Sequence, residues 1–219
     1  PLPWKGGWWR LSDIVDLEIS STMSIIKTSS INHDKILRFR NAICVSETVK
    51  GKTEPPYYYI IPQNQHDKSE YLALINLLLE HGMKLSKLKH EIMIERRLYA
   101  AGDVVVPLAQ PFRSFVKEVL EKQEFPVRHY TPEGEMIKPY DITSWSLPLH
   151  RGVEVAEINV NVTIPDNHLT ELSESPVESF VVPEETRYLL FSVNHNESFR
   201  AAFMANREGI TVNRITKSL

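Results

Sequence analysis

Two stretches of this chain repeat one pattern, and the repeat restricts the folds that the sequence can adopt. The first copy runs from Tyr57 to Leu88 and the second from Arg187 to Ile215. Each reads as a strand, a polar turn, an amphipathic helix and a second strand. The copies agree best after the helix, where Gly82 and Gly209 are each followed by apolar residues at offsets one, three and six. A strand–helix–strand unit used twice predicts an α/β fold with a mostly parallel sheet flanked by helices.

The remaining segments divide the chain around these two units. Residues 1–54 contain a tryptophan-rich segment and two expected helices, which end before a pair of prolines. Residues 55–124 hold the first α/β unit, and residues 125–183 form a proline-punctuated, β-rich insertion with alternating apolar residues. Residues 184–219 hold the second β-α-β unit of the same domain. We therefore expect one α/β domain with helices before it and an insertion within it.

Composition and charge argue against several classes of protein. The hydrophobic content of 42% and the charged content of 24% are typical of a globular protein. The net charge of -3, with acidic and basic residues interspersed, argues against nucleic-acid binding, which uses a basic surface. No apolar run reaches about 18 residues, so we expect no membrane span. The chain begins with Pro1 rather than Met, and we expect it to be an excised segment of a longer protein.

No set of residues predicts a catalytic centre or a metal site in this segment. Cys44 is the single cysteine and lies on the expected apolar face of a helix, which favours a structural thiol over a nucleophile. His168 and Glu171 have the His-x-x-Glu spacing of zinc hydrolases, but the sequence offers no matching third ligand. The turns after the strands begin with amides such as Gln63 and Gln110, which cannot be activated as nucleophiles. We predict no catalytic residue, no metal and no cofactor here.

The same amides predict a polar rim at one edge of the sheet, if both repeated units join one sheet. The residues concerned are Gln63, Asn64, Gln110, Arg113, Asn194 and Asn196. One interpretation is a ligand site in which Gln63, Gln110 and Arg113 act with Asp141 and Trp145 from the insertion. Arg113 then binds a carboxylate through two parallel hydrogen bonds. The other interpretation is structural: Asn196 caps a helix and Gln110 satisfies backbone groups at a buried turn.

A resemblance to a known family rests on three blocks of sequence. They are PWKGGWWRLSDIVD at residues 3–16, AQPFRSFVKEVLEKQEFP at 109–126 and PYDITSWSLPLHRGV at 139–153. These blocks resemble the region that follows the catalytic domain in large secreted bacterial proteins of the zinc carboxypeptidase (carboxypeptidase A-type) family. The resemblance implies a flavodoxin-like, class I glutamine amidotransferase-like fold for this segment. The family's zinc-binding and catalytic positions have no counterpart in this sequence, so none of its functional residues is carried over.

The resemblance also implies a function and a location. The chain is expected to be a non-catalytic accessory domain that docks against the upstream peptidase domain of the same chain or helps to present a peptide. Zinc is expected in that parent catalytic domain, and the location is expected to be periplasmic or secreted. Trp4, Trp8 and Trp9 surround a Gly-Gly pair and predict an aromatic clasp for such docking. The alternative function is a small-molecule or peptide-binding module that uses the Gln110 and Arg113 rim.

Overall fold

The chain divides into two compact units, residues 1–46 and 47–219. The computed structural model describes residues 7–124, 126–138, 145–174, 176 and 181–215.

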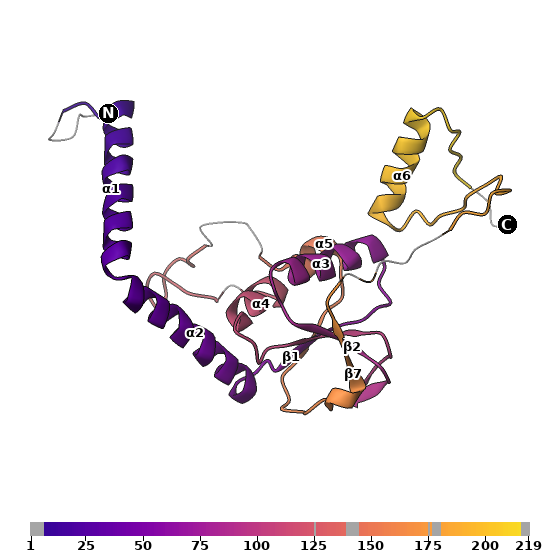
Figure 1. Ribbon diagram of the computed structural model, residues 1–219, viewed down its shortest axis with the longest axis horizontal. Coiled ribbons are helices and arrows are strands. Elements are labelled where there is room, and N and C mark those ends of the chain that lie inside the picture. Colours follow the sequence, from indigo (N-terminus) through magenta and orange to yellow (C-terminus); the bar gives the residue numbers. More distant parts are fainter. Residues whose placement is uncertain (1–6, 125, 139–144, 175, 177–180, 216–219) are drawn as a thin grey trace. The chain divides into compact units, whose positions relative to one another are not determined.

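The first unit consists of α1 (Leu11–Ile31) and the beginning of α2 (His33–Thr53) (Figure 1). The start of α1 is fixed by Asp13, whose carboxylate accepts a hydrogen bond of 2.7 Å from the backbone N–H of Arg10. No residue of α1 is buried. None of the helices in the described ranges has the length and apolarity needed to cross a membrane. The two helices of this unit therefore carry apolar side chains that the described residues leave exposed.

The second unit is built on a five-stranded sheet with the strand order β6-β1-β5-β2-β7. Every pairing in this sheet is antiparallel. The strands are β1 (Tyr58–Ile61), β2 (Leu85–Leu88), β5 (Val104–Pro107), β6 (Ala156–Ile158) and β7 (Leu169–Leu172).

The mixed α/β class is confirmed, but the expectation of a mostly parallel sheet is wrong for the described residues. Helix α3 (Lys68–Glu80) connects β1 to β2, as the first repeat predicts, and these two strands run in the same direction. They are not neighbours, because β5 lies between them and is antiparallel to both. Strand β5 can run antiparallel to β2 because the hairpin of β3 (Ile92–Ile94) and β4 (Arg97–Tyr99) connects the two strands and lets the chain reverse its direction over a short distance.

The segment expected to be an insertion provides both edge strands of this sheet. Strand β6 pairs with β1, with Tyr58 opposite Ile158, and β7 pairs with β2, with Leu85 opposite Leu172. A short helix, α5 (Leu147–Arg151), precedes β6, and a 3₁₀ turn (Asp166–His168) precedes β7. The residues from 145 to 174 are therefore part of the sheet domain.

The second copy of the repeat differs from the first in the described residues. Its helix is present as α6 (Asn196–Arg207), but residues 187–193 and 210–215 form no strand. Strands β6 and β7 already occupy the outer edges of β1 and β2, so those edges offer no free partner. Both copies therefore form a helix, but only in the first copy do the flanking residues form strands.

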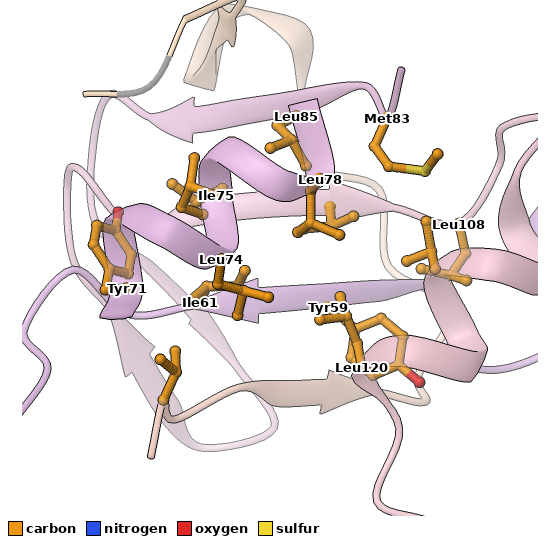
Figure 2. Close-up of a cluster of buried hydrophobic side chains, with 14 residues drawn as sticks. Tyr59, Ile61, Tyr71, Leu74, Ile75, Leu78, Met83, Leu85, Leu108 and Leu120 are labelled. Atoms are coloured by element: carbon orange, nitrogen blue, oxygen red, sulfur yellow. The ribbon is translucent and has the colours of Figure 1, made fainter. Parts of the chain in front are cut away.

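The main core lies between the sheet and the helices α3 and α4 (Arg113–Leu120) (Figure 2). Alternate residues of β1 face opposite sides, so Tyr59 and Ile61 join this core while Ile60 joins a second cluster on the other face. The buried members of the main core are Tyr59, Ile61, Tyr71, Leu74, Ile75, Leu78, Met83, Leu85, Val104, Val106, Leu108, Val116, Leu120 and Val153.

Gly51 marks a close approach between α2 and the segment after β5. A Cβ atom at this position would lie 2.0 Å from the carbonyl oxygen of Leu108 and 2.5 Å from the backbone nitrogen of Ala109. A glycine inside a helix lowers stability by about 1 kcal/mol relative to alanine. The close packing of the two backbones explains why a glycine is suited to this helix position.

We predict that Gly51→Ala destabilises the protein by about 2 kcal/mol, although alanine is the better helix former. The atoms that the new Cβ would meet belong to the backbone, which cannot move away as the end of a flexible side chain can. The free-energy cost of the steric clash is therefore larger than the gain from the higher helix propensity of alanine. Urea unfolding measures the difference, and Lys52→Ala, at an exposed neighbouring position, is the control. An unfolding midpoint for Gly51→Ala at or above that of the unchanged protein would contradict this packing.

Candidate functional site

Gln63 and Gln110, the two strand-end amides, lie at opposite ends of the sheet. Gln63 follows β1 and Gln110 follows β5, and these strands are antiparallel neighbours. The expected gathering of both amides on one rim is therefore wrong, because it required the strands to run parallel.

The side chain of Gln110 is buried and forms hydrogen bonds with backbone groups of the fold. Its side chain is only 2% exposed. Its Oε1 accepts a hydrogen bond from the backbone N–H of Lys84 at 2.9 Å, and its Nε2 donates to the carbonyl oxygen of Pro107 at 2.5 Å. These bonds join the turn after β5 to the residues before β2. The structural interpretation of Gln110 is thereby confirmed.

Arg113 lies in a buried ionic cluster with Glu47. Its Nη1 is 3.6 Å from Glu47 Oε2, and its Nη2 donates to the carbonyl oxygen of Pro55 at 3.2 Å. Its Nε is buried and has no hydrogen-bond partner in the structure as described. Lys50 and Ser114 also donate to the Glu47 carboxylate, at 2.7 and 2.6 Å. The guanidinium that was expected to bind a ligand is therefore held by the protein itself.

The pKa of Glu47 is lowered by this cluster. The hydrogen bond from Lys50 is the largest cause, followed by the one from Ser114, and together they outweigh burial, which raises the pKa. The carboxylate stays ionised, so it provides the counter-charge that Arg113 needs at this buried position.

Of the two expected site residues from the insertion, the structure describes Trp145 alone. Asp141 lies outside the residues that the structure describes. Trp145 is 62% exposed, and its backbone N–H donates to Gln123 Oε1 at 3.4 Å. Gln123 follows the end of α4. The backbone of Trp145 is therefore bonded to a residue beyond the end of α4, whereas Arg113 begins that helix.

Gln63 lies beside the start of β5. Its backbone N–H donates to Asp103 Oδ1 at 2.9 Å, and its Nε2 donates to the carbonyl oxygen of Ala101 at 2.7 Å. Gly102 has a φ of +96°, and a Cβ there would approach the Gln63 amide to 2.5 Å. The positive φ and the close contact both favour glycine at position 102, and they fix the Gln63 side chain at this end of the sheet.

Asp67 caps two helices at the same end of the sheet. Its Oδ1 accepts hydrogen bonds from the backbone N–H groups of Ser69 and Glu70, at 2.8 and 3.2 Å, which satisfies the start of α3. Its Oδ2 accepts from the backbone N–H of Asn196, the first residue of α6, at 2.8 Å. The side chain of Asn196 donates to Glu70 at 2.9 Å. This clamp joins the helices of the two repeat copies.

The pKa of Asp67 is lowered in this clamp. Burial is the largest single influence and raises the pKa, but the hydrogen bonds from Ser69, Asn196 and Glu70 together outweigh it. Sequence reasoning missed the clamp. The Asp–Lys–Ser–Glu stretch contains a readable helix-start signal, but nothing in the sequence pairs Asp67 with a residue 129 positions away.

The histidines and the cysteine form no metal site in the described part of the chain, where no group of three His, Cys, Asp or Glu side chains could hold an ion. His168 contacts His90 edge to face, with ring centroids 5.6 Å apart. Glu171 pairs with Ser86 in the sheet, and Cys44 is half-buried in α2.

We predict that Asp67→Ala destabilises the protein by about 1–2 kcal/mol, because both helix starts lose their acceptor. The lowered pKa fixes the pH dependence: the stabilisation is present above the ordinary aspartate pKa and is lost as the pH falls through the lowered value. Urea unfolding at a series of pH values measures it. The control is Asp166→Asn at an exposed position. A stability difference between Asp67→Ala and the unchanged protein that does not shrink in acid would count against the clamp.

We predict that Glu47→Gln costs about 3 kcal/mol, because it leaves the buried Arg113 guanidinium without its counter-charge. Glu124→Gln removes one partner of an exposed pair with Lys122 and is the matched control, with an expected cost below about 1 kcal/mol. Denaturant unfolding compares the two variants. If Glu47→Gln were as stable as the control, Arg113 would not depend on Glu47 and would be free for another role.

No protein family, no curated protein and no solved structure matches this chain.

Proposed function

We propose that this chain is a non-catalytic accessory α/β domain of a zinc carboxypeptidase-like protein, in which it docks against the peptidase domain of the same protein. The three sequence blocks that resemble the region after the catalytic domain of that family support the proposal. In this proposal the zinc belongs to the parent's catalytic domain, and the protein acts outside the cytoplasm. Presentation of a peptide to the catalytic domain is an additional role that the same position in the protein permits.

The observation that carries the docking role is the exposure of apolar side chains along α1 and the first part of α2. Helices in proteins gain most of their stability from burying an apolar face, and monomeric proteins rarely expose a large one. The exposed apolar residues are Leu11, Ile14, Val15, Leu17, Ile19, Met23, Ile25, Ile26, Ile31, Ile36, Leu37, Phe39, Ile43 and Val45. A partner surface that covers these residues would bury the exposed apolar side chains of both helices.

The tryptophans that precede α1 strengthen this docking role. Trp8 is 70% exposed and Trp9 is 49% exposed, and Trp4 lies outside the described residues. Large aromatic side chains contribute much of the binding energy where they enter an interface. Trp8 and Trp9 are consecutive residues just before α1, and they lie within the sequence block at residues 3–16 that resembles the carboxypeptidase family. We infer that the tryptophans and α1 form one continuous docking element.

The non-catalytic role is tested by assaying the isolated chain with zinc on free C-terminal peptides and on C-terminally blocked peptides. We expect no hydrolysis of either substrate above the rate in buffer. Measurable, protein-dependent hydrolysis would overturn the non-catalytic role, and the inactive parent with its zinc ligands replaced is the matching negative control.

The docking role predicts that backbone amides of α1 exchange hydrogen more slowly in the full parent protein than in the isolated chain, because the covered helix opens less often. Hydrogen-exchange mass spectrometry measures both. The β1 and β5 peptides serve as internal reference, since their side chains are buried in this chain alone. Equal protection of α1 in the two proteins would refute docking through this helix.

A further inference from the structure

The helices of the two repeat copies end with the same backbone geometry. Gly82 lies just beyond α3 with a φ of +76°, and Gly209 lies just beyond α6 with a φ of +79°. The backbone N–H of the next residue, Met83 or Ile210, donates to the carbonyl oxygen five residues earlier, at 3.0 and 2.9 Å. Glycine at this left-handed position and the hydrogen bond across it are the Schellman motif, which directs the chain out of a helix. The two copies therefore correspond residue by residue across this turn.

The residues that follow this turn are buried in the first copy and exposed in the second. Met83 and Leu85 are 4% and 1% exposed and belong to the main core (Figure 2). Their counterparts Ile210 and Val212 are 61% and 42% exposed. The same apolar spacing therefore leads into a buried strand in one copy and into a largely exposed segment in the other.

The segment before α6 is also apolar and exposed. Residues 187–193 read RYLLFSV, a composition typical of a buried strand. Their large apolar side chains are between 46% and 91% exposed: Tyr188, Leu189, Leu190, Phe191 and Val193. Among the residues that the structure describes, no backbone hydrogen bond joins 187–193 or 211–215 to another segment. Within the described ranges, both flanks of α6 therefore have the properties of an open sheet edge.

The first copy shows what fills the space between two such flanks. Strand β5 lies between β1 and β2 and is antiparallel to both. Val104 and Val106 of β5 join the main core, while Val105 joins the cluster on the other face, and each is at most 1% exposed. The middle strand of the unit is therefore an extended run of β-branched side chains that is buried on both faces. Because β5 already has a partner along both of its edges, it is not available to the second copy.

We propose that the second copy binds a partner strand of the same chemistry. Residues 187–193 and 210–215 form backbone hydrogen bonds to an extended peptide segment that lies between them, and the β-branched side chains of that segment cover the exposed apolar residues on both sides. Addition of a strand gives affinity through main-chain hydrogen bonds, and the contacted surfaces select apolar side chains. The occupant is thus an extended, β-branched peptide segment. This site uses no residue of α1, so it is independent of the docking role.

The binding test is a titration of the 219-residue chain with a peptide that copies residues 102–109, with lysines added at both ends for solubility. The control peptide carries Val105→Pro, which stays apolar but lacks a backbone donor that a central strand needs. Hydrogen-exchange mass spectrometry reports on residues 187–193 and 210–215. We expect saturable slowing of exchange in both segments with the first peptide and none with the second. No slowing at any concentration up to the solubility limit, or equal slowing with both peptides, overturns the proposal.

Protein concentration distinguishes a partner strand from a second copy of this chain. Without peptide, we expect exchange in residues 187–193 to be fast and independent of protein concentration. Slower exchange there at higher protein concentration would mean that the flanks of two copies pair with each other. That result would overturn the proposal of a separate partner strand.

Matched variants locate the site. Leu190→Asp lies in the segment before α6, and Val127→Asp lies outside the second copy, at a residue that is likewise 75% exposed. We expect Leu190→Asp to weaken peptide binding by about tenfold or more, because the added strand would bury an unpaired charge. Val127→Asp is expected to keep the affinity. Unchanged affinity in Leu190→Asp, or an equal loss in both variants, overturns the site.

Unfolding in urea separates the effect on binding from an effect on folding. Leu190 is exposed in the chain alone, so we expect the same unfolding midpoint for Leu190→Asp and Val127→Asp. A lower midpoint for Leu190→Asp would show that the chain buries this residue by itself, which would also overturn the proposal. Neither outcome affects the docking test, because that test measures exchange in α1.

Discussion

The insertion of β5 between β1 and β2 is the constraint on which the rest of the sheet unit depends. Residues 59–61 of β1 and 104–106 of β5 are all buried, Leu85 and Leu88 of β2 are buried as well, and β5 is antiparallel to both neighbours. Once β5 occupies the centre, β1 and β2 each have one free edge, and β6 and β7 fill those edges. The helix α3 can then connect β1 to β2 over one face while the β3–β4 hairpin and the segment around Ile164 cover the other.

The antiparallel arrangement also decides which polar residues meet. It separates Gln63 from Gln110 and places Gln63, Asp67 and Lys87 at one end of the sheet. At that end, the carboxylate of Asp67 accepts hydrogen bonds from the starts of α3 and α6. At the other end Gln110 closes a turn. Side-chain hydrogen bonds to backbone groups therefore hold both ends of the sheet.

The apolar surface proposed for docking and the buried ionic cluster belong to different parts of the chain. Apolar side chains are exposed on α1 and the first part of α2. The buried Glu47 and Arg113 pair lies in the sheet unit, where Lys50 and Ser114 also donate to the Glu47 carboxylate. Replacement of Glu47 therefore disturbs the sheet unit without changing any of the exposed apolar side chains.

The sequence by itself determined the local elements of this protein. The pattern of residues 57–88 predicted the strand, helix and second strand that the structure shows as β1, α3 and β2, and the pattern of residues 187–215 predicted the helix α6. Only the tertiary structure decided strand direction, the pairing of β6 and β7 with the sheet, and the partners of Asp67 and Arg113. The physical reason is that periodicity reports which face of an element is buried, whereas pairing between distant strands and bonds between distant side chains depend on the whole chain packing together.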